Sequence, residues 1–131
     1  MRTSIIYFLF LSFTSQFALA QIQLEETTVD TSTVISGLDI PWEIQWGPDD
    51  MLWITERFGR ISRIDPETGD QDIILDISNV VSTGGESGLL GLILHPDFNL
   101  HPYVYTAYTY MDGSDKLERI VRYEYIWNAI S

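Results

Sequence analysis

Apolar and polar residues alternate along several short stretches of this chain, and turn residues separate the stretches. Residues 42–46 (Trp-Glu-Ile-Gln-Trp) alternate strictly, which is the period-2 pattern of a strand. Proline, glycine and aspartate at residues 47–50 and 65–70 are typical of turns. An extended lead-in at residues 21–36 comes first, with a strand expected near residues 33–35. The pattern then predicts strands at residues 42–46, 51–55, 60–64 and 72–77.

A second series of strands is predicted further along the chain. The run Leu89 to Leu94 is apolar throughout, as expected for a strand that is buried on both faces. Two more strands are expected at residues 103–108 and 119–123, joined by a polar, glycine-containing hairpin loop at residues 111–117. No turn and no fourth strand are expected after Tyr125.

The two series match each other in sequence and in order, which indicates a repeated unit. Residues 46–49 (Trp-Gly-Pro-Asp) correspond to residues 94–97 (Leu-His-Pro-Asp), an offset of 48 positions. Residues 60–64 (Arg-Ile-Ser-Arg-Ile) correspond to residues 119–123 (Arg-Ile-Val-Arg-Tyr), an offset of 59. The alternative is a chance match between two hairpins, because turn chemistry is generic.

Four short antiparallel strands in about 40 residues are the unit from which β-propeller blades are built. The first unit covers about residues 37–80, and the incomplete second unit covers about residues 84–125. The predicted fold is therefore all-β, a partial β-propeller of about one and three-quarter four-stranded antiparallel blades. A propeller closes with four to eight blades, so we expect a fragment of a larger ring.

Residues 1–20 have the three parts of a secretory signal peptide. Arg2 supplies the positive charge, Ile5 to Phe13 form the apolar segment, and Ala18-Leu19-Ala20 is a small-x-small cleavage site. The apolar segment is shorter than the roughly 20 residues that a spanning helix needs; an uncleaved anchor is the alternative. We expect an exported mature protein, periplasmic or secreted, that begins at Gln21 and has no membrane segment.

The composition limits the classes of partner. Without the leader the chain has 6 basic and 19 acidic residues, a formal charge of −13. Such a chain repels nucleic acid and anionic membranes, because basic side chains are needed to replace phosphate counterions. It contains no cysteine, so an exported form must fold without disulfides. It also lacks a phosphate loop and a Gly-x-Ser-x-Gly motif, which argues against kinases and hydrolases.

Eight short motifs follow one another in a specific order over residues 37–125. They are Gly-Leu-Asp-Ile-Pro-Trp (37–42), Trp-Gly-Pro-Asp (46–49), Leu-Trp-Ile-Thr-Glu-Arg (52–57), Gly-Arg-Ile (59–61), Gly-Leu-Leu-Gly (88–91), His-Pro-Asp-Phe (95–98), Pro-Tyr-Val-Tyr (102–105) and Arg-Ile-Val-Arg-Tyr (119–123). In this order they resemble the N-terminal part of the soluble glucose/sorbosone dehydrogenases, quinoprotein aldose dehydrogenases with a six-bladed propeller. Residues 37–131 would then be the N-terminal part of such a propeller.

The resemblance implies pyrroloquinoline quinone (PQQ) and calcium as cofactors, and a sugar and an electron acceptor as partners. In the family a histidine acts as general base while hydride passes from the sugar to the quinone. That histidine, the calcium-binding segment and the basic cofactor clamps lie downstream of the matched motifs. No catalytic or metal-binding residue is therefore expected in this chain, and neither cofactor is expected to bind it well.

Glu86 is the one candidate cofactor-binding residue that the resemblance supplies. It stands where the family has a glutamine that contacts the cofactor, two positions before Gly-Leu-Leu-Gly. A carboxylate facing an anionic tricarboxylate quinone is repelled unless it is protonated or bridged by a cation. The alternative for Glu86 is a solvated loop carboxylate.

Other conspicuous residues are expected to be structural. His95 occupies the turn position that Gly47 occupies in the first unit, and His95 and His101 lack a third ligand for zinc. The acidic run at residues 65–76 has glycine at its fifth position instead of the sixth that a calcium loop needs, so a turn is expected. Tryptophans 42, 46 and 53 are expected to pack between blades.

The sequence thus predicts the N-terminal fragment of an exported PQQ-dependent sugar (aldose) dehydrogenase, an oxidoreductase fragment that is inactive alone. Two alternatives stay open. One is a non-enzymatic propeller module that binds a partner, of the hedgehog-interacting type, and the other is a calcium-dependent propeller lactonase.

Overall fold

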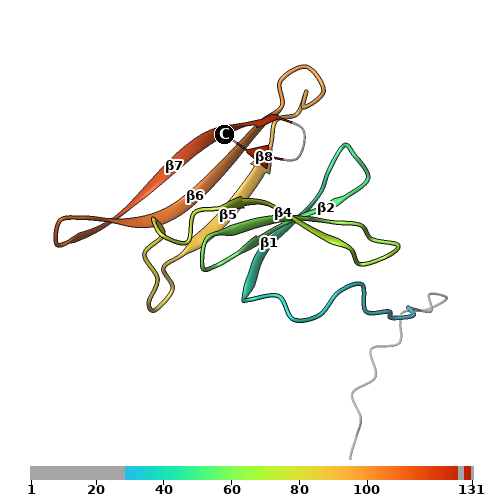
Figure 1. Cartoon of the computed structure of the whole chain (residues 1–131), viewed down its shortest axis with the longest axis horizontal. Coiled ribbons are helices and arrows are strands. Elements are labelled where there is room, and N and C mark those ends of the chain that lie inside the picture. The colour runs from blue at the N-terminus through green and yellow to red at the C-terminus, as the bar shows by residue number, and fades with distance from the viewer. Residues whose placement is uncertain (1–28, 127–128, 131) are drawn as a thin grey trace, which may run out of the picture. The chain divides into compact units, whose positions relative to one another are not determined.

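The computed structural model describes residues 29–126 and 129–130 (Figure 1). Residues 32–131 form one compact unit that contains every strand of the described part. The predicted signal peptide at residues 1–20 lies outside the described residues. Among the described residues, no helix is long and apolar enough to cross a membrane.

The strands form two antiparallel sheets, each in simple sequential order. The first, called sheet A, consists of β1 (Pro41–Trp46), β2 (Leu52–Glu56), β3 (Arg60–Ile64) and β4 (Gln71–Asp76). The second, called sheet B, consists of β5 (Leu89–Leu94), β6 (Tyr103–Asp112), β7 (Asp115–Ile126) and β8 (Ala129–Ile130). Figure 1 shows sheet A in cyan to green and sheet B in yellow to red. The predicted all-β fold is confirmed.

Strand pairing confirms the repeated unit. One row of paired residues crosses three strands at the corresponding place in each sheet, Trp46–Leu52–Ile64 in sheet A and Leu94–Val104–Tyr123 in sheet B. The first strands are therefore related by 48 positions and the third strands by 59, as the sequence indicated. A chance match between two hairpins would not preserve the register across three strands.

The core lies between one face of sheet A and one face of sheet B. Trp53, Ile61 and Ile74 are buried on the face of sheet A that contacts sheet B. From sheet B the core includes the buried residues Leu89, Leu92, Leu94, Val104 and Tyr108. Burying one large apolar side chain contributes about 1.5–3 kcal/mol, so this interface holds the unit together without disulfides.

Several polar groups at the interface are kept neutral or paired, whereas the buried Thr106 Oγ1 and Arg57 Nε have no hydrogen-bond partner among the described residues. Burial raises the pKa of Tyr123 to about 12, and its interactions with Tyr108 add to the effect, so the phenol remains neutral. The Trp53 indole N–H donates to Asp49 Oδ1 at 3.0 Å, and Arg63 forms an ion pair of 2.6 Å with Asp49 Oδ2. The Arg63 guanidinium also lies over the Tyr125 ring of sheet B, 5.6 Å from its centroid. Arg63 therefore connects the turn before β2 to both sheets.

Side chains of sheet A satisfy the edge of β5, the first strand of sheet B. The Thr55 hydroxyl donates to the Leu90 carbonyl at 2.7 Å. The Leu94 N–H donates to Gln45 Oε1 at 3.1 Å. An edge strand otherwise presents unpaired backbone groups, so these bonds fix how the two sheets meet.

Gly88, just before β5, lies directly against Arg57, in the loop after β2. Its φ is +155°, and a Cβ at this position would overlap the side chain and carbonyl oxygen of Arg57. Its N–H donates to Thr109 Oγ1 at 2.6 Å, and the next residue, Leu89, donates its N–H to the Arg57 carbonyl at 2.8 Å. Only glycine fits here without moving sheet A away from sheet B.

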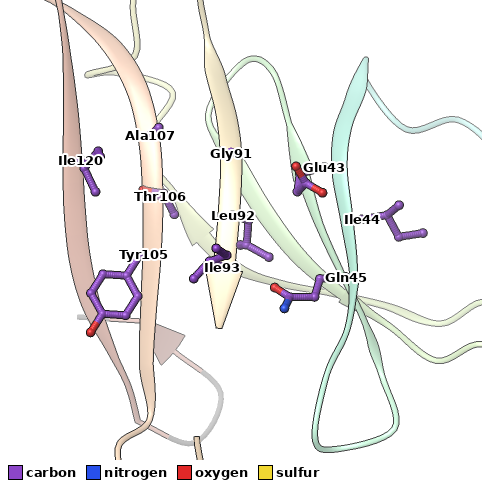
Figure 2. Close-up of a pocket in the computed structure, with 10 residues that line it drawn as sticks. All are labelled: Glu43, Ile44, Gln45, Gly91, Leu92, Ile93, Tyr105, Thr106, Ala107 and Ile120. Atoms are coloured by element: carbon purple, nitrogen blue, oxygen red, sulfur yellow. The ribbon is translucent and has the colours of Figure 1, made fainter. Parts of the chain in front are cut away.

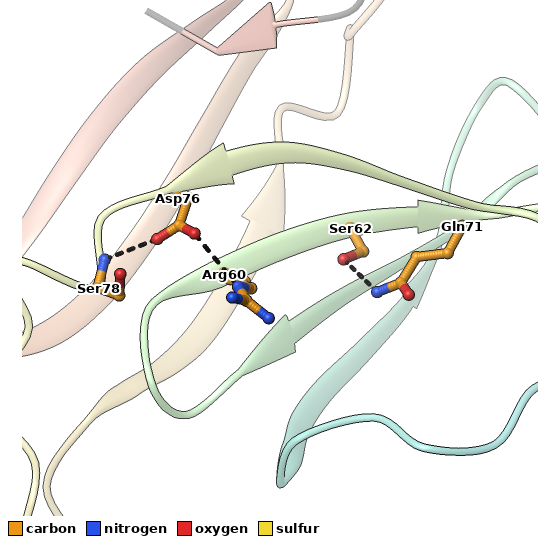
Figure 3. Close-up of polar contacts among 5 residues, drawn as sticks. All are labelled: Arg60, Ser62, Gln71, Asp76 and Ser78. Atoms are coloured by element: carbon orange, nitrogen blue, oxygen red, sulfur yellow. Dashed lines mark hydrogen bonds and ion pairs between the residues drawn. The ribbon is translucent and has the colours of Figure 1, made fainter.

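The far edge of sheet A carries a solvent-exposed pair (Figure 3). Arg60 Nε lies 3.2 Å from Asp76 Oδ2, and both side chains are about half exposed. Hydrogen bonds from the side chain and the backbone N–H of Ser78 lower the pKa of Asp76. Beside this pair, the Gln71 amide donates to the Ser62 hydroxyl at 2.9 Å and ties β4 to β3.

Several predictions about single elements are wrong. The described lead-in has no strand at residues 33–35. A fourth strand does follow Tyr125, because Ala129–Ile130 pairs with the end of β7 as β8. The loop at residues 111–117 is shorter than predicted, since β6 and β7 continue to Asp112 and from Asp115, with the tight turn at Gly113 and Ser114.

The burial of three apolar residues that were expected to be packed also differs from the prediction. The run Leu89 to Leu94 is not buried on both faces, because Ile93 is mostly exposed. Trp53 packs between the sheets as predicted, whereas Trp42 and Trp46 are about half exposed. The reason is common to all three exposed residues: each lies on a sheet face that no other sheet of the described part covers. The predicted turn at residues 65–70 is confirmed, since Asp65 accepts the N–H groups of Glu67 and Thr68.

The two arginines of β3 provide a matched test of the interface. We expect Arg63→Ala to lower the free energy of unfolding by about 2–3 kcal/mol, because Arg63 is only 14% exposed and its loss leaves Asp49 without its ion pair. Arg60→Ala should cost less than about 1 kcal/mol, since the Arg60–Asp76 pair is exposed. Urea unfolding followed by tryptophan fluorescence measures both; equal losses would contradict the role given to Arg63.

Gly88→Ala tests the contact before β5. We expect a loss of at least about 3 kcal/mol in the free energy of unfolding, because backbone strain is added to the overlap with Arg57. Gly113→Ala is the control, since Gly113 also has a positive φ of 60° but has nothing within 4 Å of the added Cβ. Gly113→Ala should lower the free energy of unfolding by about 1 kcal/mol. A similar small loss for both variants in urea unfolding would show that the close approach is not needed.

Candidate functional site

Glu86 lies at the tip of a tight turn that precedes β5. The Ser87 N–H donates to the Gly84 carbonyl at 3.2 Å and closes the turn. Gly85 has a φ of +60°, a conformation that glycine adopts without strain. The Glu86 side chain is exposed, and its carboxylate has no hydrogen bond or ion pair within the described part of the chain. It is therefore free to contact a ligand or solvent.

Two cations, one from the loop after β2 and one from β7, hold this turn. Arg57, in the loop after β2, donates from Nη1 to the Gly85 carbonyl at 3.0 Å. Lys116, at the start of β7, lies with Nζ 3.4 Å from the Thr83 carbonyl and 3.3 Å from Ser87 Oγ. The position of the Glu86 turn thus depends on both sheets, and two positive charges are bonded to the segment that carries its carboxylate.

Arg57 retains an unused donor. Its Nε is buried and has no hydrogen-bond partner among the described residues. Buried donors without a partner are uncommon, because they lose the bond to water without replacing it. The guanidinium also lies over the Phe58 ring, 5.3 Å from its centroid. The Arg57 side chain is therefore held in a fixed orientation, with one N–H shielded from solvent.

Sequence reasoning did not identify Arg57 or Lys116. A signal was present, since only 6 basic residues follow the leader and Lys116 is the only lysine of the chain. In a strongly acidic chain each basic residue is a candidate for a specific contact. Two of their three acceptors, however, are backbone carbonyls, which the sequence does not mark.

The structure does not bring the histidines to Glu86. His95 and His101 lie in the turn after β5, with ring centroids 5.2 Å apart. Glu86 lies before the other end of the six-residue strand, which is about 20 Å long. His95 Nδ1 accepts the Asp97 N–H at 3.0 Å, which is a turn-forming bond, as predicted. Within residues 29–126 and 129–130, no three His, Cys, Asp or Glu side chains are grouped to hold a metal ion.

A shallow groove of about 570 Å³ runs along β5 (Figure 2). Glu43 and Gln45 of β1 border one side, and Tyr105 of β6 and Ile120 of β7 border the other. Alternation along β1 places Glu43 and Gln45 on the face opposite its tryptophans, although the sequence did not single them out. The groove is mainly apolar.

Comparisons with known proteins agree on one family. The glucose/sorbosone dehydrogenase family model matches residues 38–128. Quinoprotein glucose dehydrogenase B of Acinetobacter calcoaceticus is 38% identical over 98 residues, which cover 73% of this chain and 20% of that protein. The chain therefore spans about a fifth of the length of this relative.

Solved structures give the same result. An oxidoreductase (glucose dehydrogenase) from Thermus thermophilus is 35% identical, with a TM-score of 0.67 over 76% of this chain and 29% of that one. The PQQ-bound aldose sugar dehydrogenase of Streptomyces coelicolor is 32% identical, with a TM-score of 0.62 over 76% of this chain and 31% of that one. These matches confirm that the two sheets are part of a β-propeller. With the family model matching well over half of its length, the chain belongs to the glucose/sorbosone dehydrogenase family.

Proposed function

We propose that this chain is the N-terminal part of an exported PQQ-dependent sugar dehydrogenase, and that Glu86 lies at the edge of its cofactor site. The observation that carries the proposal is the likeness of these two sheets to an aldose sugar dehydrogenase solved with PQQ bound. Export is supported by the signal-peptide pattern of residues 1–20. The substrate class would be sugars, with a separate electron acceptor.

The charges at the turn are compatible with an anionic cofactor only in part. Arg57 and Lys116 supply positive charge at the turn. Glu86 supplies a negative charge that opposes a tricarboxylate unless a proton or a cation such as calcium lies between them. The turn would therefore hold one edge of PQQ, and a bound cation would remove the repulsion from Glu86.

When bound, PQQ would supply the quinone that accepts hydride from the sugar. The described residues would orient it and set the local charge. They would not remove the proton from the sugar, because general base catalysis requires a base within hydrogen-bond reach and the histidines lie about 20 Å away along β5. The chain alone is accordingly proposed to be inactive, with calcium and substrate sites supplied by other parts of the propeller.

The first test is turnover by the chain itself. We expect no reduction of an electron-accepting dye when the purified chain is mixed with PQQ, calcium and a panel of aldoses, because both histidines of the chain lie at the far end of β5 from the turn. A PQQ-dependent dehydrogenase of the same family, assayed in parallel, is the positive control. Dye reduction that depends on both PQQ and sugar would contradict the proposed division of the site.

Glu86→Gln tests contact with the cofactor independently of turnover. We expect about two- to five-fold tighter PQQ binding at neutral pH without calcium, because removing an exposed like-charge contact is worth about 0.5–1 kcal/mol. Quenching of tryptophan fluorescence measures the binding, and added calcium should reduce the difference. Glu67→Gln, in the turn before β4, is the control and should bind PQQ like the unchanged chain. Unchanged affinity in Glu86→Gln would mean that Glu86 does not face the cofactor.

A further inference from the structure

A small pocket lies at the end of sheet A, next to the turn that joins β2 to β3. Its volume is about 60 Å³, and it is bordered by Asp39, Glu56, Phe58, Arg60 and Ser78. A pocket of this size admits an ion with a few water ligands, whereas organic ligands occupy pockets of about 300 Å³ or more. Three of the five bordering residues are charged, so the species that fits this pocket is set by charge.

Glu56, the last residue of β2, is buried without a partner. Only 3% of the residue is exposed, and within the described part of the chain its carboxylate has no hydrogen bond and no ion pair. Buried carboxylates are normally paired or bound to a metal ion, because an isolated charge is costly to remove from water. Glu56 is directly opposite Arg60 in the strand register, so both side chains point to the face of sheet A that carries the pocket.

The residues that cover Glu56 belong to the same compact unit. Ile40 has a φ of +53°, and its carbonyl accepts the Arg57 N–H at 3.0 Å. This bend fixes the lead-in against the end of β2 and places Asp39 at the pocket. Because Glu56 is already buried, further parts of a propeller that pack on sheet A would meet the residues around it instead of its carboxylate.

Arg60 is the basic residue that borders the pocket, and its charge is engaged elsewhere. Its Nε lies 3.2 Å from Asp76 Oδ2, and Figure 3 shows this pair beside Ser78. The Ser78 N–H donates to Asp76 Oδ1 at 3.0 Å, so the Ser78 hydroxyl keeps lone pairs for another contact. Arg60 and Asp76 balance each other, which leaves the two negative charges of Asp39 and Glu56 at the pocket.

We propose that this pocket binds a divalent cation through oxygen ligands, and that calcium fits it best. Glu56 and Asp39 supply carboxylate oxygens, Ser78 supplies its hydroxyl oxygen, and water completes the shell. Calcium accepts six to eight oxygen ligands in flexible geometry, whereas magnesium demands a near-ideal octahedron and zinc prefers nitrogen and sulfur. With two carboxylates and several waters, the dissociation constant should be about 10⁻⁴ to 10⁻³ M.

The ion joins three segments that are distant in sequence. They are the lead-in at Asp39, the end of β2 at Glu56 and the loop after β4 at Ser78. A ligand that binds only the folded chain stabilises it, so calcium should raise the temperature of unfolding.

Calorimetric titration of Ca²⁺ into the purified full chain, stripped of metal and free of PQQ, measures the site directly. Sodium chloride at about 0.15 M screens the diffuse attraction of ions to the acidic chain. We expect saturable binding of one calcium ion per chain. Glu56→Gln and Asp39→Asn should each weaken it at least about ten-fold, because each removes one of the two charged ligands. Glu118→Gln removes the same charge from an exposed position of β7 and should bind calcium like the unchanged chain.

Thermal unfolding separates loss of the ion from loss of the fold. Asp39 is exposed and has no bond within the described part, so Asp39→Asn should unfold like the unchanged chain when calcium is absent. Calcium should then stabilise the unchanged chain and Glu118→Gln, but neither Asp39→Asn nor Glu56→Gln.

Three results would overturn the proposal. They are the absence of saturable calcium binding, full affinity in Glu56→Gln, and a loss in Glu118→Gln as large as that in Glu56→Gln. The last of these would mean that calcium is attracted by net charge alone. Since PQQ is absent from these measurements, their outcome does not depend on the proposed cofactor site.

Discussion

The packing of one face of sheet A on one face of sheet B is the interaction on which the rest of the structure depends. The chain has no cysteine, so the described unit relies on burial of apolar surface and on the hydrogen bonds that accompany it. Trp53 stands at the centre of this interface, where its ring meets Phe98 and Tyr125 edge-on at centroid distances of 5.6 and 5.3 Å. Asp49 and Arg63 satisfy the polar groups that this burial brings together. The interface thus combines buried aromatic contacts with a paired polar margin.

The candidate site is a consequence of that interface. Arg57 follows β2 of sheet A and Lys116 belongs to β7 of sheet B, yet both bond to the turn that carries Glu86. Leu89 donates its N–H to the Arg57 carbonyl, so the first residue of β5 is bonded to the loop that also holds the turn. Any change that separates the sheets would therefore move the turn relative to one of its two cations. A site built in this way is precise only while both sheets remain in register.

Strands that alternate and are half-buried could be predicted closely, because period-2 patterning reflects burial within the chain. The bounds of β3 and β5 were predicted to the residue. Burial of Ile93, Trp42 and Trp46 could not be predicted, since it depends on which surfaces lie opposite, and alternation does not contain that information. β8 was not predicted because a strand of two residues has no detectable period. The length of the hairpin loop between β6 and β7 was overestimated because polar residues such as Asp112 and Asp115 still pair as strand residues. At the candidate site, Glu86 was found through family resemblance, whereas Arg57 and Lys116 act on carbonyl groups that carry no sequence signal.

The distribution of charge follows from the same packing. Every basic residue of the described part has a partner inside the chain. Arg60 and Arg63 form ion pairs with Asp76 and Asp49, and Lys116 bonds to the turn at residues 83–87. Arg57 donates to the Gly85 carbonyl and lies over Phe58, while Arg119 and Arg122 lie over tyrosine rings of β6. The positive charges are therefore used to join strands and turns, and the outer surface is dominated by carboxylates. An anionic ligand would be repelled by most of this surface and could approach only where a local donor outweighs the net charge. Arg57 and Lys116, both bonded to the turn that carries Glu86, supply positive charge at one such place.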